Sequence, residues 1–144
     1  MAVRMKLDLA SLKIGLEDWT ALDARARQAL CDAVAENDDD VARFRKDVAG
    51  MLADCGRDAP VRLDSAKVAR VAIWRDAGPP PDDVARMLAR LGHENAWSRL
   101  DRFGRYVAVA LAAKKDADKL SAALAELEAA ARTSGAATTR GSHA

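Results

Sequence analysis

The stretch that decides the fold class is residues 95–115, NAWSRLDRFGRYVAVALAAKK. Its large apolar side chains return every three or four residues, which places them on one face of a helix. These residues are Trp97, Leu100, Phe103, Val107 and Leu111. The spacing therefore predicts one amphipathic helix from about Asn95 to Lys115.

Six further segments show helical spacing or a start signal for a helix. Their predicted ranges are 1–10, about 18–35, 40–54, 65–76, 82–91 and 116–131. Asn37 and the three aspartates after it favour a helix start, because they cap free N–H groups and carry negative charge at the positive end of the dipole. Gly56 is a typical C-terminal stop, and the prolines at 79–81 separate two helices. Segments 11–16 and 56–63 are predicted as links.

The composition supports the same fold class. Half of the residues are hydrophobic, but only 4% are aromatic. Sheets favour β-branched and aromatic side chains, whereas alanine favours helix. We predict an all-α fold, a compact bundle of about six to seven helices. It forms one domain over 1–131, in halves of about 1–56 and 64–131, with a flexible tail at 132–144 that lacks apolar anchors.

One short pattern occurs twice in the chain. It reads Trp-x-x-Leu-Asp-x-x-x-Arg and occupies residues 19–27 and 97–105. A predicted short helix precedes each copy, with a valine and a leucine four residues apart. The two halves are therefore predicted to be related helical units that pack face to face, because one helical pair cannot cover its own apolar face.

Charge and hydropathy exclude or weaken several classes of protein. Lys and Arg number 23 against 22 Asp and Glu, a net charge of +1, whereas a strong electrostatic case for nucleic acid needs a basic domain. No apolar run is long enough for a transmembrane helix, and we expect no signal peptide. With two cysteines and no disulfide framework, the cytoplasm is the expected compartment.

The start of the chain carries a family pattern: Val-Arg-x-Lys-Leu-Asp, a short link, Ile-x-Leu-x-x-Trp, then a leucine and an arginine. The residues are Val3, Arg4, Lys6, Leu7, Asp8, Ile14, Leu16, Trp19, Leu22 and Arg27. This pattern resembles the nitrate reductase-associated protein family, and the copy at 97–105 looks like that family's C-terminal half. The resemblance implies a small bacterial accessory protein of nitrate assimilation, often encoded beside nitrate reductase and molybdenum-cofactor genes, and implies no reaction.

One motif of the resembled family is displaced here. Many members carry Gly-His-Glu-Asn after the second arginine, whereas this chain has it at 92–95, before Trp97. No role of that motif is carried over. From the residues themselves, His93 can work as an acid or base near neutral pH, but a loop in which Asn95 caps the next helix explains the same residues.

The remaining chemistry-bearing side chains are sparse. Cys31 is predicted to be a small core residue and Cys55 to be exposed; two thiols and one histidine supply too few ligands for a typical zinc site. Seven arginines suit anion binding, yet interleaved aspartates favour solvated faces with ion pairs. They are Arg25, Arg27, Arg43, Arg45, Arg99, Arg102 and Arg105.

Two features favour a protein partner. Trp74 lies beside the proline-rich break and is predicted to be partly exposed, although tryptophans at helical spacing are usually core. The helix at 116–131 has a leucine stripe that can close the core or face a partner helix. The predicted partner-binding residues are Trp74, Leu120, Leu124 and Leu127.

We predict a non-enzymatic accessory or adaptor protein with no cofactor and no metal. Its partner would be nitrate reductase or a molybdenum-cofactor enzyme, and a homodimer is left open. One alternative is a small cofactor- or anion-binding protein or enzyme that uses His93, Cys55 and arginines. A second is a helix-turn-helix DNA-binding regulator built from 82–112, whose five arginines are set against the lack of basic excess in the whole chain.

Overall fold

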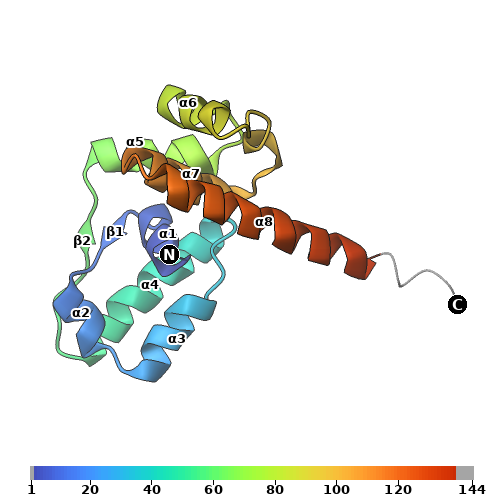
Figure 1. Ribbon diagram of the computed structural model, residues 1–144. Coiled ribbons are helices and arrows are strands. Elements are labelled where there is room, and N and C mark those ends of the chain that lie inside the picture. Colours follow the sequence, from blue (N-terminus) through green and yellow to red (C-terminus); the bar gives the residue numbers. More distant parts are fainter. Residues whose placement is uncertain (1, 139–144) are drawn as a thin grey trace, which may run out of the picture. The chain divides into compact units, whose positions relative to one another are not determined.

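The structure, a computed structural model, describes residues 2–138; the side chains of 131 and of 133–138 are outside this description, as are residues 1 and 139–144 (Figure 1). It divides into two compact units, Met1–Ala72 and Ile73–Ala144. The boundary falls inside α5, Ser65–Arg75, rather than in the predicted 56–63 link. The described residues hold eight α-helices and one two-stranded sheet, so the predicted all-α class is confirmed. A single domain over 1–131 stays a prediction.

The first unit contains four of the helices and the sheet. Its elements are α1 (Ala2–Leu9), β1 (Leu12–Lys13), α2 (Leu16–Ala21), α3 (Ala24–Asp32), α4 (Asp38–Asp54) and β2 (Val61–Arg62). The strands are antiparallel, with Leu12 opposite Arg62 and Lys13 opposite Val61. Both strands lie in the segments predicted as links. Their pairing brings the link after α1 beside the link after α4.

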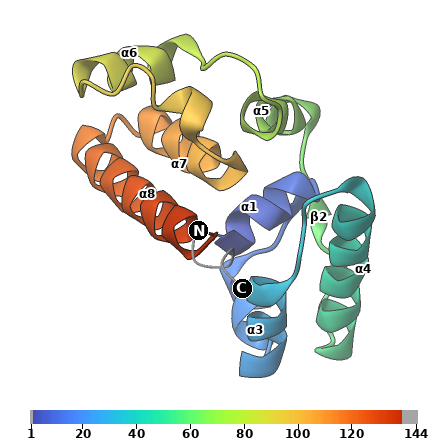
Figure 2. The same ribbon diagram turned by 90° about the vertical axis from the view of Figure 1, so that its right-hand side faces the viewer.

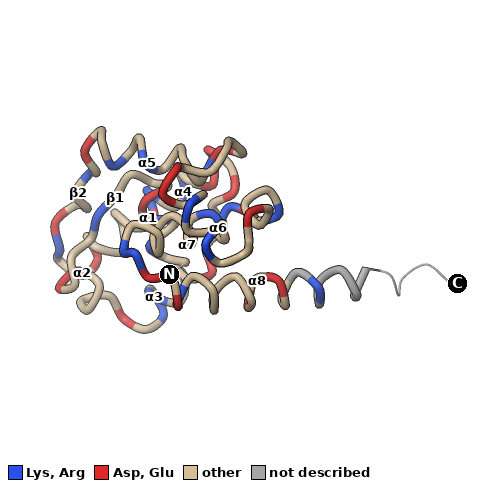
Figure 3. The backbone as a smooth tube through the Cα atoms, turned by 45° about the horizontal axis from the view of Figure 1, so that its top comes forward, with Lys and Arg blue, Asp and Glu red and all other residues tan. Residues whose placement is uncertain are grey.

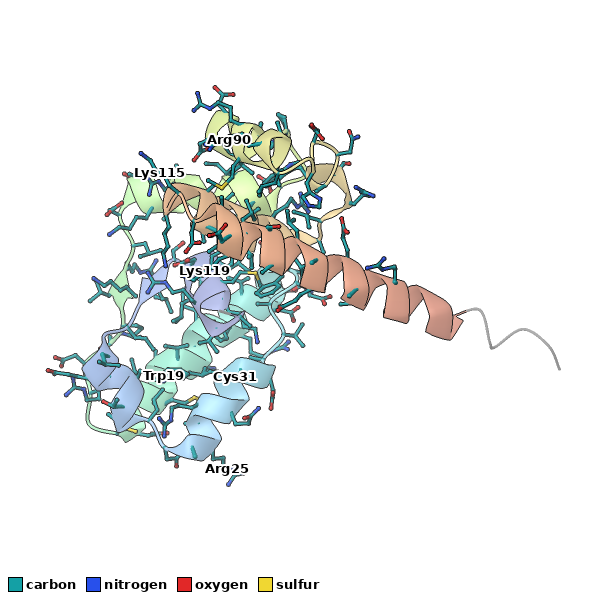
Figure 4. The ribbon with its side chains drawn as sticks, viewed as in Figure 1. Trp19, Arg25, Cys31, Arg90, Lys115 and Lys119 are labelled. Atoms are coloured by element: carbon teal, nitrogen blue, oxygen red, sulfur yellow. The ribbon has the colours of Figure 1, made fainter. Side chains whose placement is uncertain are left out.

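The core of the first unit comes from every helix except α2, together with the links. It consists of Leu7, Ala10, Leu12, Leu22, Leu30, Phe44, Val48 and Leu52. Trp19 of α2, labelled in Figure 4, packs against this core while remaining half-buried. Burying these side chains supplies the main driving force for folding of the unit.

The buried side chain of Lys6 links two helices of this unit by hydrogen bonds. Lys6 of α1 is only 9% exposed, and its Nζ donates to the carbonyl oxygens of Leu30, at 3.3 Å, and Cys31. These carbonyls belong to the last turn of α3, where a helix has no internal donors left and where its dipole is negative. Arg45 links α4 to the residue after α1, because its Nε donates to the carbonyl oxygen of Ala10 at 3.0 Å.

The second unit is a helical layer that follows α5. Its elements are α6 (Asp82–Arg90), a 3₁₀ turn η1 (Trp97–Arg99), α7 (Arg102–Ala113) and α8 (Ala117–Thr138). Figures 1 and 2 both show α7 and α8 running side by side. Leu120 and Leu124 of α8 are buried, as are Val107 and Leu111 of α7. This unit therefore has its own apolar core.

The structure corrects two predicted helices in the same way. The predicted helix at 18–35 is two helices, α2 and α3, and the predicted helix at 95–115 is η1 followed by α7. In each case the leucine of the repeated pattern is extended, with φ −66° and ψ 137° at Leu22 and φ −72° and ψ 135° at Leu100. The aspartate that follows caps the next helix, since Asp23 accepts from Ala26 N and Asp101 from Gly104 N, both at 2.7 Å.

Other helix limits agree with the sequence. Asn37 caps α4 by accepting from Asp40 N at 2.9 Å. Gly56 follows the end of α4 with a φ of +69°, the left-handed conformation expected of a glycine stop. The last helix is longer than predicted, because α8 continues to Thr138 instead of ending at 131. The predicted tail at 132–144 is therefore helical up to 138, and the rest of it lies outside the described residues.

We expect Lys6→Met to destabilise the protein. Methionine keeps the apolar stem but removes the donor, which leaves the two carbonyl oxygens at the end of α3 without their partner. The expected loss is about 1.5–3 kcal/mol in the free energy of unfolding, the usual range for hydrogen bonds to a charged group. Urea unfolding measures it, with Lys46→Met on the exposed side of α4 as the matched control. Equal stability of both variants would contradict a fastening role for Lys6.

Replacing Asp8 should raise the stability of the protein, in contrast to Lys6→Met, and the gain should depend on pH. Burial raises the pKa of Asp8 above 3.8, and Arg4, whose Nε lies 3.4 Å away, offsets this only in part. The pKa of Asp8 is higher in the folded state than in the unfolded state. The free energy of unfolding therefore falls as pH rises from the unfolded-state pKa to the folded-state pKa, and it stays lower at higher pH. Asp8→Asn should therefore raise stability at pH 7 and change it little well below pH 3.8. Urea unfolding at both pH values checks this, and a destabilised variant at pH 7 would refute it.

Candidate functional site

The second unit contains a cavity of about 510 Å³ between the corner at η1 and the second half of α8. The corner contributes Ala96, Arg99, Leu100 and Asp101, and α8 contributes Leu124, Leu127, Glu128, Ala130 and Arg132. The described lining therefore comes from two segments, 96–101 and 124–132, that belong to one compact unit. A volume of this size is typical of a ligand or docking site.

The corner is held in place by contacts on both sides of Leu100. On one side, Trp97 is 6% exposed and its Nε1 donates to the carbonyl oxygen of Gly78 at 2.8 Å. On the other side, Asp101 caps α7. Gly104 lies against this turn so closely that a Cβ there would be 2.9 Å from Leu100 Cδ2. The glycine therefore allows Leu100 to occupy its place at the cavity.

The cavity has an apolar floor and a rim of mixed charge. Leu124 is 1% exposed, whereas Leu100 and Leu127 are half-buried and can contact an occupant. Arg99 and Arg132 carry positive charge, and Asp101 and Glu128 carry negative charge. Because the signs balance, the rim has no net preference for an anion. This balance weakens the alternative of an anion or cofactor site built on arginines.

The second half of α8 extends beyond the helix against which its first half packs. The helix α7 has 12 residues and α8 has 22, so at 1.5 Å per residue α8 is longer by roughly 15 Å. Figures 1 and 2 show this end of α8 continuing past α7. The cavity lies along this part of the helix, so its occupant would contact both α8 and the corner.

His93 lies beside the cavity rather than at the centre of a catalytic group. Its Nδ1 is 3.9 Å from Glu128 Oε1, a contact that is an ion pair only when the imidazole is protonated. Within the described residues, no three His, Cys, Asp or Glu side chains are grouped closely enough to bind a metal ion. The two residues of the alternative site, His93 and Cys55, belong to different units.

The cysteines are both free and exposed. The prediction for Cys55 is confirmed, whereas the prediction of a core position for Cys31 is wrong. Cys31 lies on α3, as labelled in Figure 4, and follows Leu30, which is 1% exposed and takes the inward position of that turn. Neighbouring positions on a helix point in different directions, so both could not face the core.

The predicted partner-binding residues have different surroundings. The expected exposure of Trp74 is wrong, since its ring is 3% exposed and packs edge-on against Tyr106 with ring centroids 5.1 Å apart. Leu120 and Leu124 are buried at 0% and 1% exposure. Leu127 is half-buried and lines the cavity. It is the member of the predicted set that can contact a partner without a change in the core.

The arginines are dispersed among backbone and acidic partners rather than gathered on one ligand. Arg105 donates to the carbonyl oxygen of Asp76 at 2.9 Å. A hydrogen bond from Arg75, together with the charges of Arg75, Arg102 and Arg105, holds the pKa of Asp76 below its usual value. Figure 3 shows positive and negative residues interspersed along the chain. These contacts agree with the predicted ion-paired, solvated faces.

In the segment 82–112, the second helix, α7, is largely buried, whereas Arg86 and Arg90 of α6 are exposed. In α7, Gly104, Tyr106, Val107, Ala108, Leu111 and Ala112 are buried. Within α7, only Ala113 at its end is exposed. A recognition helix must instead present polar side chains to base edges in the major groove. The burial of α7 therefore argues against the helix-turn-helix alternative.

Sequence reasoning missed most of the cavity. Of its lining, the leucine stripe predicts Leu124 and Leu127, whereas no motif in the sequence indicates Glu128 or Arg132. A usable signal was present in α8, where an acidic and a basic residue four positions apart follow two leucines. The part played by the corner could not be predicted, because it depends on the helix break at Leu100.

Paired glycine substitutions test how the corner is built. Alanine is the better helix former by about 1 kcal/mol, so Gly50→Ala, with open space around it in α4, should stabilise the protein by up to that amount. Gly104→Ala should instead destabilise it by about 1–3 kcal/mol, because the new methyl group overlaps Leu100 and the capping carboxylate. Thermal unfolding measures both changes, and stabilisation by Gly104→Ala would contradict the close contact.

Comparison with known proteins places the chain in a family. Residues 1–127 match the family described as conserved nitrate reductase-associated protein (Nitr_red_assoc). No curated protein and no solved structure matches the chain. Among the described residues, none of the helices has the length and apolar character required to cross a membrane. The match covers both copies of the repeated pattern and most of the cavity lining, and on this basis the chain belongs to the conserved nitrate reductase-associated protein family.

Proposed function

We propose that the protein is a non-catalytic accessory protein that binds a protein partner in nitrate assimilation or molybdoenzyme maturation, in the cytoplasm. The family description supplies the association with nitrate reductase. The observation that carries the binding role is the cavity on α8, with an apolar floor at Leu100 and Leu127 and a charged rim. An apolar centre with polar edges is the usual composition of a protein-binding surface.

The cavity favours a helical segment of the partner. Its α8 wall runs from Leu124 to Arg132, which is about 12 Å of helix or a little over two turns. Short amphipathic helices dock in such grooves through apolar side chains spaced by one turn. Charges at the rim would then select the partner and its orientation more than they would add affinity.

A matched pair of variants tests this function. Leu127→Arg places a charge on the floor of the cavity, whereas Ala125→Arg places the same charge on an exposed position of α8. We expect the wild-type protein and Ala125→Arg to co-purify nitrate reductase or another molybdenum enzyme from cells grown on nitrate. Leu127→Arg should recover at least about tenfold less, which corresponds to 1.4 kcal/mol of binding. Mass spectrometry with labelled standards measures the recovery.

Two results would count against the proposal. If neither enzyme is enriched over an unrelated bait, the association with nitrate assimilation fails. If Leu127→Arg recovers as much enzyme as Ala125→Arg does, the partner binds elsewhere. Trp74 is unsuitable for this test because its ring is part of the core, so its substitution would report on folding.

A further inference from the structure

Two opposite charges, Glu128 and Arg132, lie about one turn apart in the second half of α8. Glu128 is 43% exposed and Arg132 is exposed. Within the described part of the chain, no ion pair within 4.0 Å involves Arg132, and Glu128 has only the 3.9 Å contact with His93. An acidic segment and then a basic one follow each other along this part of α8 in Figure 3. Both side chains also line the cavity.

This order of charges is complementary to itself. If a second α8 lies antiparallel to the first, with a two-fold axis near Ala130, Glu128 of each helix comes opposite Arg132 of the other. Two equivalent ion pairs then form, because a two-fold interface uses the same patch on both copies. A parallel arrangement would instead place like charges opposite each other. For a second copy of this helix, the pattern thus favours the antiparallel direction over the parallel one.

Two partly exposed leucines lie beside these charges in the cavity. Leu127 precedes Glu128 and is half-buried, and Leu100 lies across the cavity from α8. A helix that places its charges over Glu128 and Arg132 also covers these two leucines. The net charge of the chain is only +1, so electrostatic repulsion between two copies is weak.

We propose that α8 pairs with α8 of a second copy of this chain, antiparallel, through reciprocal Glu128–Arg132 ion pairs over the Leu100–Leu127 floor. The contact spans little more than two turns of helix, so it is a small interface of the weak, transient kind. Because it covers the surface proposed above for the partner, self-association and partner binding compete. That competition rests on the proposed function, whereas the dimer does not.

Complementary charge reversals test the pairing. Glu128→Arg gives a chain with two positive charges at the interface, and Arg132→Glu gives one with two negative charges. Each variant alone should dimerise at least about tenfold more weakly than the wild type, because like charges then face each other. Mixed in equal amounts, the two variants should form a heterodimer at least as readily as the wild type forms its dimer. An ion pair within one helix cannot explain this result, because each variant carries two like charges at positions 128 and 132. Opposite charges meet only when the two variants bind each other.

Sedimentation equilibrium over a range of concentrations is the measurement, with masses compared with the 15.4 kDa of the chain. Glu126→Arg is the matched control, since Glu126 is exposed on α8 but does not line the cavity. It should dimerise like the wild type. Circular dichroism establishes that each variant keeps its helix content. The wild-type protein at 15.4 kDa throughout, or variants that fail to pair when mixed, would overturn the proposal; the co-purification experiment above is unaffected by either outcome.

Discussion

Within each unit, the path of the chain depends on one local constraint. This constraint is a leucine in extended conformation followed by an aspartate that caps the next helix. At Leu22 and Asp23 the chain leaves α2 and enters α3, and at Leu100 and Asp101 it leaves η1 and enters α7. The leucine leaves the helical conformation, and the aspartate satisfies a free N–H group of the next helix. Without this break, each pair of elements would continue as one straight helix. The corner that forms half of the cavity would then be absent.

Much of the fold could be predicted because the relevant signals are local. The Asn37 cap and the Gly56 stop require only neighbouring residues, and the structure has α4 where they place it. The repeated pattern was also visible in the sequence. Its meaning was missed because apolar residues on both sides of the break stay in phase with a continuous helix, so periodicity at Leu100 cannot tell a helix from a corner. The aspartate after each leucine was the signal for a break.

The exposure of single side chains could not be predicted with the same success, because it is decided by residues far away in the sequence. Trp74 is buried against Tyr106, 32 positions later, and nothing near Trp74 indicates this contact. Lys6 is the converse case, since a lysine is expected in solvent but lies at the end of α3, 24 residues away. Its buried charge is tolerated because the carbonyl oxygens there need donors. The candidate site was hidden for the same reason, as it combines a corner and a helix that meet only after folding.

The two copies of the repeated pattern differ in one respect that bears on function. Leu22 is 1% exposed within a core to which α1, α3 and α4 all contribute. Lys6 joins α1 to α3, and Arg45 of α4 donates to Ala10 just after α1. Leu100 has the same backbone conformation but stays half-buried, because its neighbour α8 passes it and continues beyond α7. One copy therefore closes a core and the other leaves a partly exposed apolar surface beside charges of both signs. Because burial of apolar surface is favourable in water, this surface is the part of the second unit on which we place the two proposed occupants, a second α8 or the helix of a partner.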